Sequence, residues 1–70
     1  MYEQMIREIL AENEIRGIEP RHVEAYMRIE HSTLDGLSRR QFVHEVHVAV
    51  ACIAEGGVAM AERVAQSQGL

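Results

Sequence analysis

The segment from Arg39 to Glu55 constrains the fold most, because it is largely apolar and its apolar residues recur at helical spacing. Ser38 followed three residues later by Gln41 is a capping-box pattern, which is typical of a helix start. The apolar residues that follow share one helical stripe: Phe42, Val46, Ala49, Val50 and Ile53. An alternating set in the same segment would instead suit a strand: Val46, Val48, Val50 and Cys52. We favour a helix over 39–55, because the cap and the spacing agree over a longer stretch.

Three more segments have helical signals. Residues 2–16 carry an apolar stripe that begins at Tyr2, and Gly17 provides a stop. Pro20 suits the first position of a second helix over 20–31, with its apolar side chains facing inward: Val23, Tyr26 and Met27. Gly56 and Gly57 separate the third helix from a last one over 58–67, whose expected inward residues are Val58, Ala61, Val64 and Ala65.

These segments predict an all-α fold, a small four-helix domain that spans residues 1–70. Short connections favour antiparallel neighbours. The connector between the second and third helices contains Leu34 and Leu37, which we expect to anchor it to the core. In this arrangement the 39–55 helix is expected to be the centre of the domain.

A chain of 70 residues makes a small core, so such domains often gain stability from disulfides, a metal or a partner. Cys52 is the only cysteine, which excludes an internal disulfide and suits a reducing compartment. No apolar run approaches the length of a membrane span, and the N-terminal residues do not resemble a signal peptide. We therefore expect a cytoplasmic protein that is not associated with a membrane.

Charge is unevenly distributed along the chain. The net charge is −4, and all seven basic residues are arginine. Residues 1–15 contain four glutamates and a single arginine, whereas residues 16–47 are balanced in charge and hold all four histidines. The overall negative charge argues against nucleic acid as a partner, since nucleic-acid binding relies on basic side chains that neutralise phosphates.

His44 and His47 are one residue short of the spacing of a zinc-binding helix motif. Their i, i+3 spacing places both on one side of a helix, so a metal pair is geometrically possible. A third ligand would come from His22, from His31 or from a second subunit. Two solvent-facing histidines are the simpler interpretation, and we expect no metal or other cofactor.

Catalytic signals are weak. Cys52 lies within an apolar helix, without the glycine-rich turn or helix start that would activate a thiol. The five glycines all fall at helix ends or turns, so none forms a phosphate-binding loop. We expect no catalytic residues and no enzymatic activity.

The helix over 39–55 has more apolar and cationic surface than a core stripe requires. Val48 and Cys52 project beside that stripe, and a homodimer would use them together with Met60. The start of the helix resembles a recognition helix in its arginines and glutamine. The expected partner-binding residues are Arg39, Arg40, Gln41, His44, His47, Val48 and Cys52.

The favoured hypothesis is a small non-enzymatic interaction module that docks on a larger protein. Small acidic proteins encoded by phages and mobile elements often inhibit or adapt a host protein, and anti-CRISPR inhibitors belong to that class. The first alternative is a helix-turn-helix-like transcriptional regulator that binds DNA through Arg39, Arg40, Gln41 and His44. The second alternative is a histidine-based metal-binding module.

Overall fold

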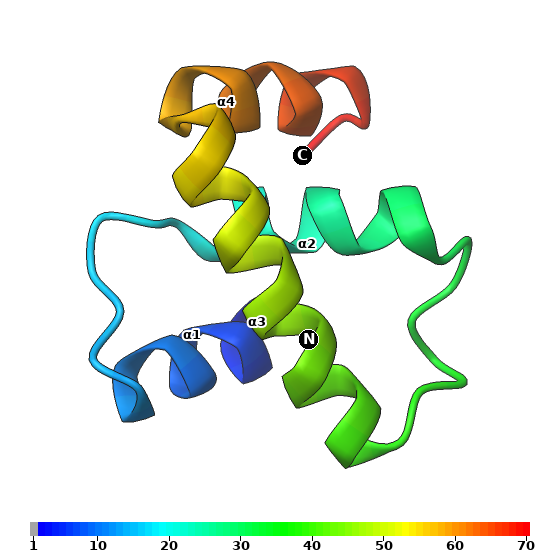
Figure 1. Ribbon diagram of the computed structural model, residues 1–70. Coiled ribbons are helices and arrows are strands. Elements are labelled where there is room, and N and C mark those ends of the chain that lie inside the picture. The colour runs from blue at the N-terminus through cyan, green and yellow to red at the C-terminus, as the bar shows by residue number, and fades with distance from the viewer. Residues whose placement is uncertain (1) are drawn as a thin grey trace.

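The computed structural model describes residues 2–70 and contains four helices (Figure 1). They are α1 (Tyr2–Glu12), α2 (Pro20–Glu30), α3 (Arg39–Gly56) and α4 (Val58–Ser67). The small all-α domain predicted from the sequence is confirmed. The strand alternative for residues 46–52 is wrong, because this stretch lies inside α3.

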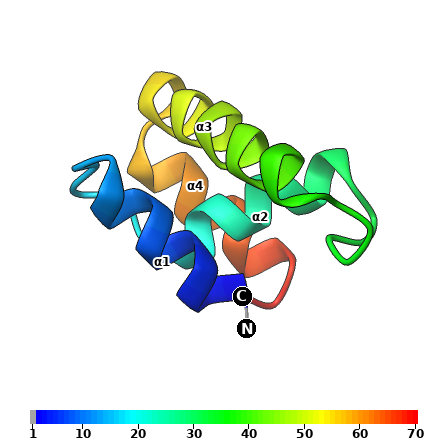
Figure 2. The ribbon, with the colours of Figure 1, turned by 90° about the horizontal axis from the view of Figure 1, so that it is seen from below.

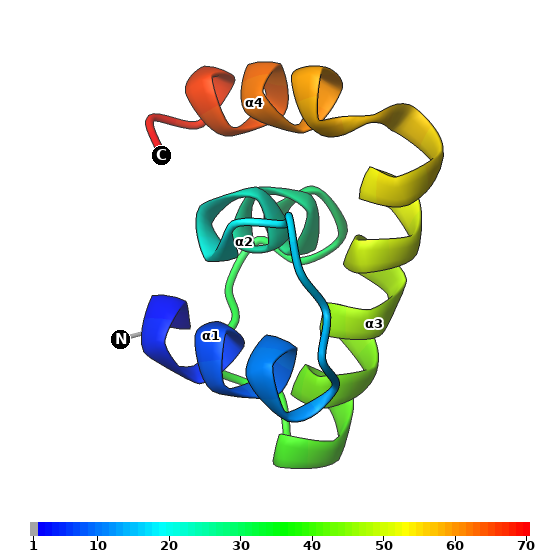
Figure 3. The same ribbon diagram turned by 90° about the vertical axis from the view of Figure 1, so that its left-hand side faces the viewer.

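Three of the helices form a stack, and the fourth runs across it. Figure 3 shows α1, α2 and α4 one above another, with α3 along one side of the stack. α1 and α2 run in opposite directions, as expected for neighbours, whereas α3 crosses the others (Figure 1). The start of α1 and the C-terminus both lie on the side away from α3 (Figures 2 and 3).

The centre of the domain is α2 and not the 39–55 helix. α2 and α3 each contact all three other helices, but the contacts of α2 with α1 and with α4 are more extensive than those of α3. Six of the 11 residues of α2 are buried, compared with four of the 18 in α3. The expectation failed because α2 is enclosed on several sides even though its sequence is polar, and α3 is covered on one face only.

The core of α3 follows its predicted stripe. Phe42, Val46, Ala49 and Ile53 are buried, and Val50 is half-buried against them. The capping box is present: the Ser38 N–H donates to Gln41 Oε1 at 3.0 Å, and the Gln41 N–H donates to Ser38 Oγ at 3.2 Å. Two orphan donors at the helix start are thereby satisfied.

The connector before α3 is anchored as expected. Leu34 is buried in the core, and Leu37 packs against the core from the surface. Their side chains hold residues 31–38 on the domain, so the start of α3 has a fixed position.

α1 ends earlier than its sequence pattern predicts. The helix stops at Glu12 and not at residue 16, because Glu14 adopts a left-handed conformation with φ of 56°. The Ile15 N–H donates to the Leu10 carbonyl at 2.9 Å and the Glu14 N–H to the Ala11 carbonyl at 3.1 Å, which is a Schellman motif. Gly17 is therefore not the helix stop. The sequence does not indicate the actual end of α1, because a glutamate occupies the left-handed position where glycine is usual.

α4 packs through alanines and not through its valines. Ala61 and Ala65 are fully buried, whereas Val58 is 49% exposed and Val64 is half-buried. The prediction that Val58 points inward is wrong. The chain turns sharply at Gly57, whose φ of 88° favours glycine, and the resulting direction of α4 leaves Val58 exposed. Small side chains then allow α4 to approach α2 closely.

Candidate docking surface

The first three turns of α3 carry an exposed group of two arginines and two histidines, which we call the cationic face after its arginines: Arg39, Arg40, His44 and His47. The leucine anchors in the preceding connector fix where this group lies. Among residues 2–70, no salt bridge involves any of its four members. The first turn of α3 contains no acidic residue either. The cationic face therefore has no intramolecular charge partner in the described part of the chain.

Gln41 is exposed, but its side chain is already committed to the capping box. It therefore belongs to the helix start more than to a binding surface. Sequence reasoning grouped it with the arginines because it lies next to them in the chain, whereas the structure gives its carbonyl oxygen a local partner.

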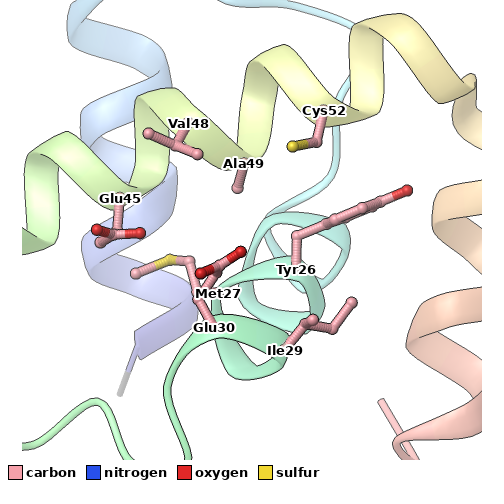
Figure 4. Close-up of a pocket in the computed structure, with 8 residues that line it drawn as sticks. All are labelled: Tyr26, Met27, Ile29, Glu30, Glu45, Val48, Ala49 and Cys52. Atoms are coloured by element: carbon pink, nitrogen blue, oxygen red, sulfur yellow. The ribbon is translucent and has the colours of Figure 1, made fainter.

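Val48 and Cys52 lie on the neighbouring flank of α3 and face α2. Together with α2 they line an open groove of about 210 Å³ (Figure 4). Its walls are Tyr26, Met27, Ile29 and Glu30 from α2, and Glu45, Val48, Ala49 and Cys52 from α3.

The groove has an acidic end and an apolar end. Glu30 and Glu45 lie together at one end, and Tyr26 and Cys52 lie toward the other (Figure 4). His31 Nε2 lies 3.5 Å from Glu45 Oε1, so one of the two carboxylates has a partner when that histidine is protonated. The groove is smaller than the roughly 300–1,000 Å³ that is typical of small-molecule sites.

The metal site considered for His44 and His47 is not assembled by the chain. His22 and His31 do not come near enough to complete it, since the only group of three potential ligands within residues 2–70 is Glu19, His22 and Glu62. Neither of the two histidines that could have supplied a third ligand is placed beside His44 and His47. His22 points toward α4, and His31 lies beside Glu45.

Sequence reasoning missed the polar cluster around His22. This side chain is only 2% exposed, and its Nε2–H donates to Glu62 Oε1 at 2.9 Å. Arg21 forms an ion pair with the same carboxylate, and its Nε lies 3.3 Å from Glu19 Oε2. The cluster joins the start of α2 to α4. No local pattern announces it, because Glu62 lies 40 residues from His22 in the chain.

Hydrogen bonding in this cluster favours an ion-pair network over a metal site. His22 Nδ1 is buried and has no hydrogen-bond partner. A metal on Nε2 would require Nδ1 to carry the proton, and metal-bound histidines normally donate that proton to an acceptor. The Arg21 guanidinium also occupies the Glu62 carboxylate that a cation would need. We interpret the cluster as a structural connection between two helices.

This network makes the free energy of unfolding depend on pH in the acidic range. The hydrogen bond from Arg21, followed by that from His22, lowers the pKa of Glu62 from 4.5 to about 2. The pKa of Glu62 is lower in the folded protein than in the unfolded chain. The ionised carboxylate therefore stabilises the fold fully above the unfolded pKa, and this stabilisation is lost as pH falls toward 2.

We therefore expect Glu62→Gln to flatten the acid limb of the stability curve. In urea unfolding followed by circular dichroism, the wild type should lose stability more steeply than the variant between about pH 5 and pH 2. Glu55→Gln, at an exposed residue with no ion pair among residues 2–70, is the matched control and should track the wild type. Parallel curves for wild type and Glu62→Gln would contradict the role assigned to Glu62.

Comparison with protein-family models, curated proteins and solved structures found no significant match for this chain. No helix within residues 2–70 is both long and apolar enough to cross a membrane.

Proposed function

We propose that this protein is a non-enzymatic interaction module that docks its cationic face on an acidic surface of a larger protein. The observation that carries the proposal is the placement of Arg39 and Arg40. Both are exposed in the first turn of α3, and neither has an ion-pair partner within residues 2–70.

Folding alone gives a poor reason for two arginines at this position. The N-terminal end of a helix carries a partial positive charge, so cations there cost about 0.3–1 kcal/mol where anions would stabilise. The capping box satisfies backbone donors at the start of α3 without help from the two arginines. Residues that carry a local cost without a local gain are expected at functional sites, and this supports a binding role for the two arginines.

The chemistry of the face suits protein recognition. Arginine is among the residues that contribute most to protein interfaces, and its planar guanidinium binds carboxylates through two parallel hydrogen bonds. His44 and His47 extend the same face along α3. Three exposed glutamates supply opposite charge elsewhere on the surface and add selectivity for one orientation of the partner: Glu8 and Glu12 on α1, and Glu14 just after it.

DNA binding is the competing function for the same arginines. The net charge of −4 opposes it. The connector between α2 and α3 spans residues 31–38 and is longer than the turn of about three to four residues in a helix-turn-helix. These two features favour a protein partner.

At a finer level, the proposal is an inhibitor or adaptor encoded by a phage or mobile element and acting in the cytoplasm, as anti-CRISPR proteins do. Small size, acidic charge and a preformed helical surface support this biological setting. The residues of the cationic face support the docking chemistry and do not depend on the setting.

The test is selective capture from a lysate of the native host. A tag after Leu70 lies on the side away from α3 and leaves the cationic face free. The wild type and the control Arg16→Glu, at another exposed arginine, should recover the same protein in stoichiometric amount. The double variant Arg39→Glu/Arg40→Glu should not recover it.

The result against the proposal is equally specific. Recovery of the same protein by all three forms would show that the cationic face is not the docking surface. Binding of duplex DNA at physiological salt that is lost in Arg39→Glu/Arg40→Glu would establish the regulator function in its place.

A further inference from the structure

An apolar strip, distinct from the cationic face, continues from the groove onto α4. It is formed by Ile29, Tyr26, Val48, Cys52 and Met60. Ile29 is 59% exposed, Val48 38% and Met60 45%. Gly56 joins the two parts, because a Cβ atom at Gly56 would lie 3.7 Å from Tyr26 Oη and 3.9 Å from Met60 Cβ.

The strip carries opposite charges at its two ends. Glu30 and Glu45 form the acidic end of the groove. Arg63 follows Met60 by one turn on the exposed side of α4, and such i, i+3 residues are neighbours on a helix surface. Neither Glu30 nor Arg63 forms a salt bridge within residues 2–70.

We infer that the strip binds a second copy of this chain in a two-fold symmetric dimer. In a two-fold interface the same surface meets itself with its direction reversed. The acidic end of one copy then lies against Arg63 of the other, and the apolar middle of each strip covers the other. A surface with an apolar middle and ends of opposite charge is self-complementary in this orientation.

The size of the strip sets the expected affinity. A stable interface buries about 800 Å² per partner, which is a large share of the 4,512 Å² that this chain exposes. We expect an interface centred on five apolar side chains to lie at the low end of that range, where complexes are weak, so association should be visible at micromolar concentrations and above. The dimer leaves Arg40, His44 and His47 on a neighbouring flank, and it does not rest on the proposed docking function.

The proposed dimer is tested by measuring its mass, and the orientation of the two copies by exchanging the charges of Glu30 and Arg63. Analytical ultracentrifugation should show a concentration-dependent shift from 7.9 kDa to twice that mass. Val48→Asp should abolish the shift, while circular dichroism shows an intact fold. Arg63→Glu should raise the dissociation constant by about threefold to tenfold, because it sets acid against acid. Adding Glu30→Arg to Arg63→Glu places a cation opposite the new glutamate, with Glu45 still present, and should bring the dissociation constant back toward the wild-type value.

Cross-linking tests the middle of the strip. Cys52 is exposed. In the proposed dimer it lies in the middle of the strip, so the two thiols would lie close to the symmetry axis. A short bismaleimide should link wild-type dimers efficiently. It should fail with Glu12→Cys in a Cys52→Ser background, which moves the thiol to the exposed end of α1.

A monomer at concentrations well above the micromolar range would overturn the inference. A dimer unaffected by Val48→Asp, or one weakened further by Glu30→Arg in the Arg63→Glu background, would overturn it as well. Neither result bears on partner capture through Arg39 and Arg40, so the two proposals fail separately.

Discussion

Val46→Asp is expected to leave the chain unfolded at neutral pH. Val46 is 0% exposed and belongs to the hydrophobic core cluster. An aspartate there has no cation or donor positioned for it, and an unpaired buried charge costs about 4 kcal/mol or more. A domain of this length has a total stability of only roughly 4–10 kcal/mol. Far-ultraviolet circular dichroism should show loss of the helical signal.

Val48→Asp is the matched control, two residues further along the same helix. Val48 is partly exposed, so its carboxylate remains hydrated and the monomer should keep its helical signal and a cooperative thermal transition. A folded Val46→Asp protein would show that the inward face of α3 is assigned wrongly. An unfolded Val48→Asp protein would show the same for its outward flank.

Ala61→Leu is expected to cause the second large loss of stability. Ala61 is 0% exposed and is one of the two buried residues through which α4 packs. A leucine adds volume where the surrounding atoms leave none, which typically costs about 1–3 kcal/mol. The urea midpoint should fall accordingly.

Ala59→Leu is the matched control for Ala61→Leu, because it makes the same change in helix propensity and hydrophobicity at an exposed position. Ala59 is exposed on the same helix, so a leucine there meets solvent and should change stability by less than about 0.5 kcal/mol. Equal effects at the two positions would contradict the close packing of α4.

The helices of this protein were largely predictable because their signals are local. Ser38 and Gln41 marked the start of α3, and the spacing of Phe42, Val46 and Ile53 marked its buried face. Pro20 likewise marked the start of α2. Each signal depends on residues within a few turns, which is the range that propensity, capping and periodicity cover.

Features that depend on distant contacts were missed. α2 is the central helix although it contains buried His22 and Glu24, because other helices enclose it, Glu62 pairs with His22 Nε2 and Arg28 pairs with Glu24. Glu14 ends α1 in a conformation that its residue type does not suggest. Neither property is encoded in a short window of sequence.

The candidate surface was predicted in part. The exposure of Arg39, Arg40, His44, His47, Val48 and Cys52 follows from helical geometry and is found in the structure. Sequence reasoning did not divide them into a cationic face and a groove wall, because that division depends on where α2 lies. It also could not see that Glu30 and Glu45 close one end of the groove.

The central claim, that the start of α3 is a docking surface, is tested most directly by titrating the captured partner with Arg40→Ala. Arg40 is exposed and has no ion pair within residues 2–70, so its truncation leaves the fold intact. We predict a loss of affinity of at least about tenfold, as for an arginine that contributes strongly to an interface. The wild-type affinity should also fall with rising salt. An affinity unchanged by Arg40→Ala and by salt would contradict the claim.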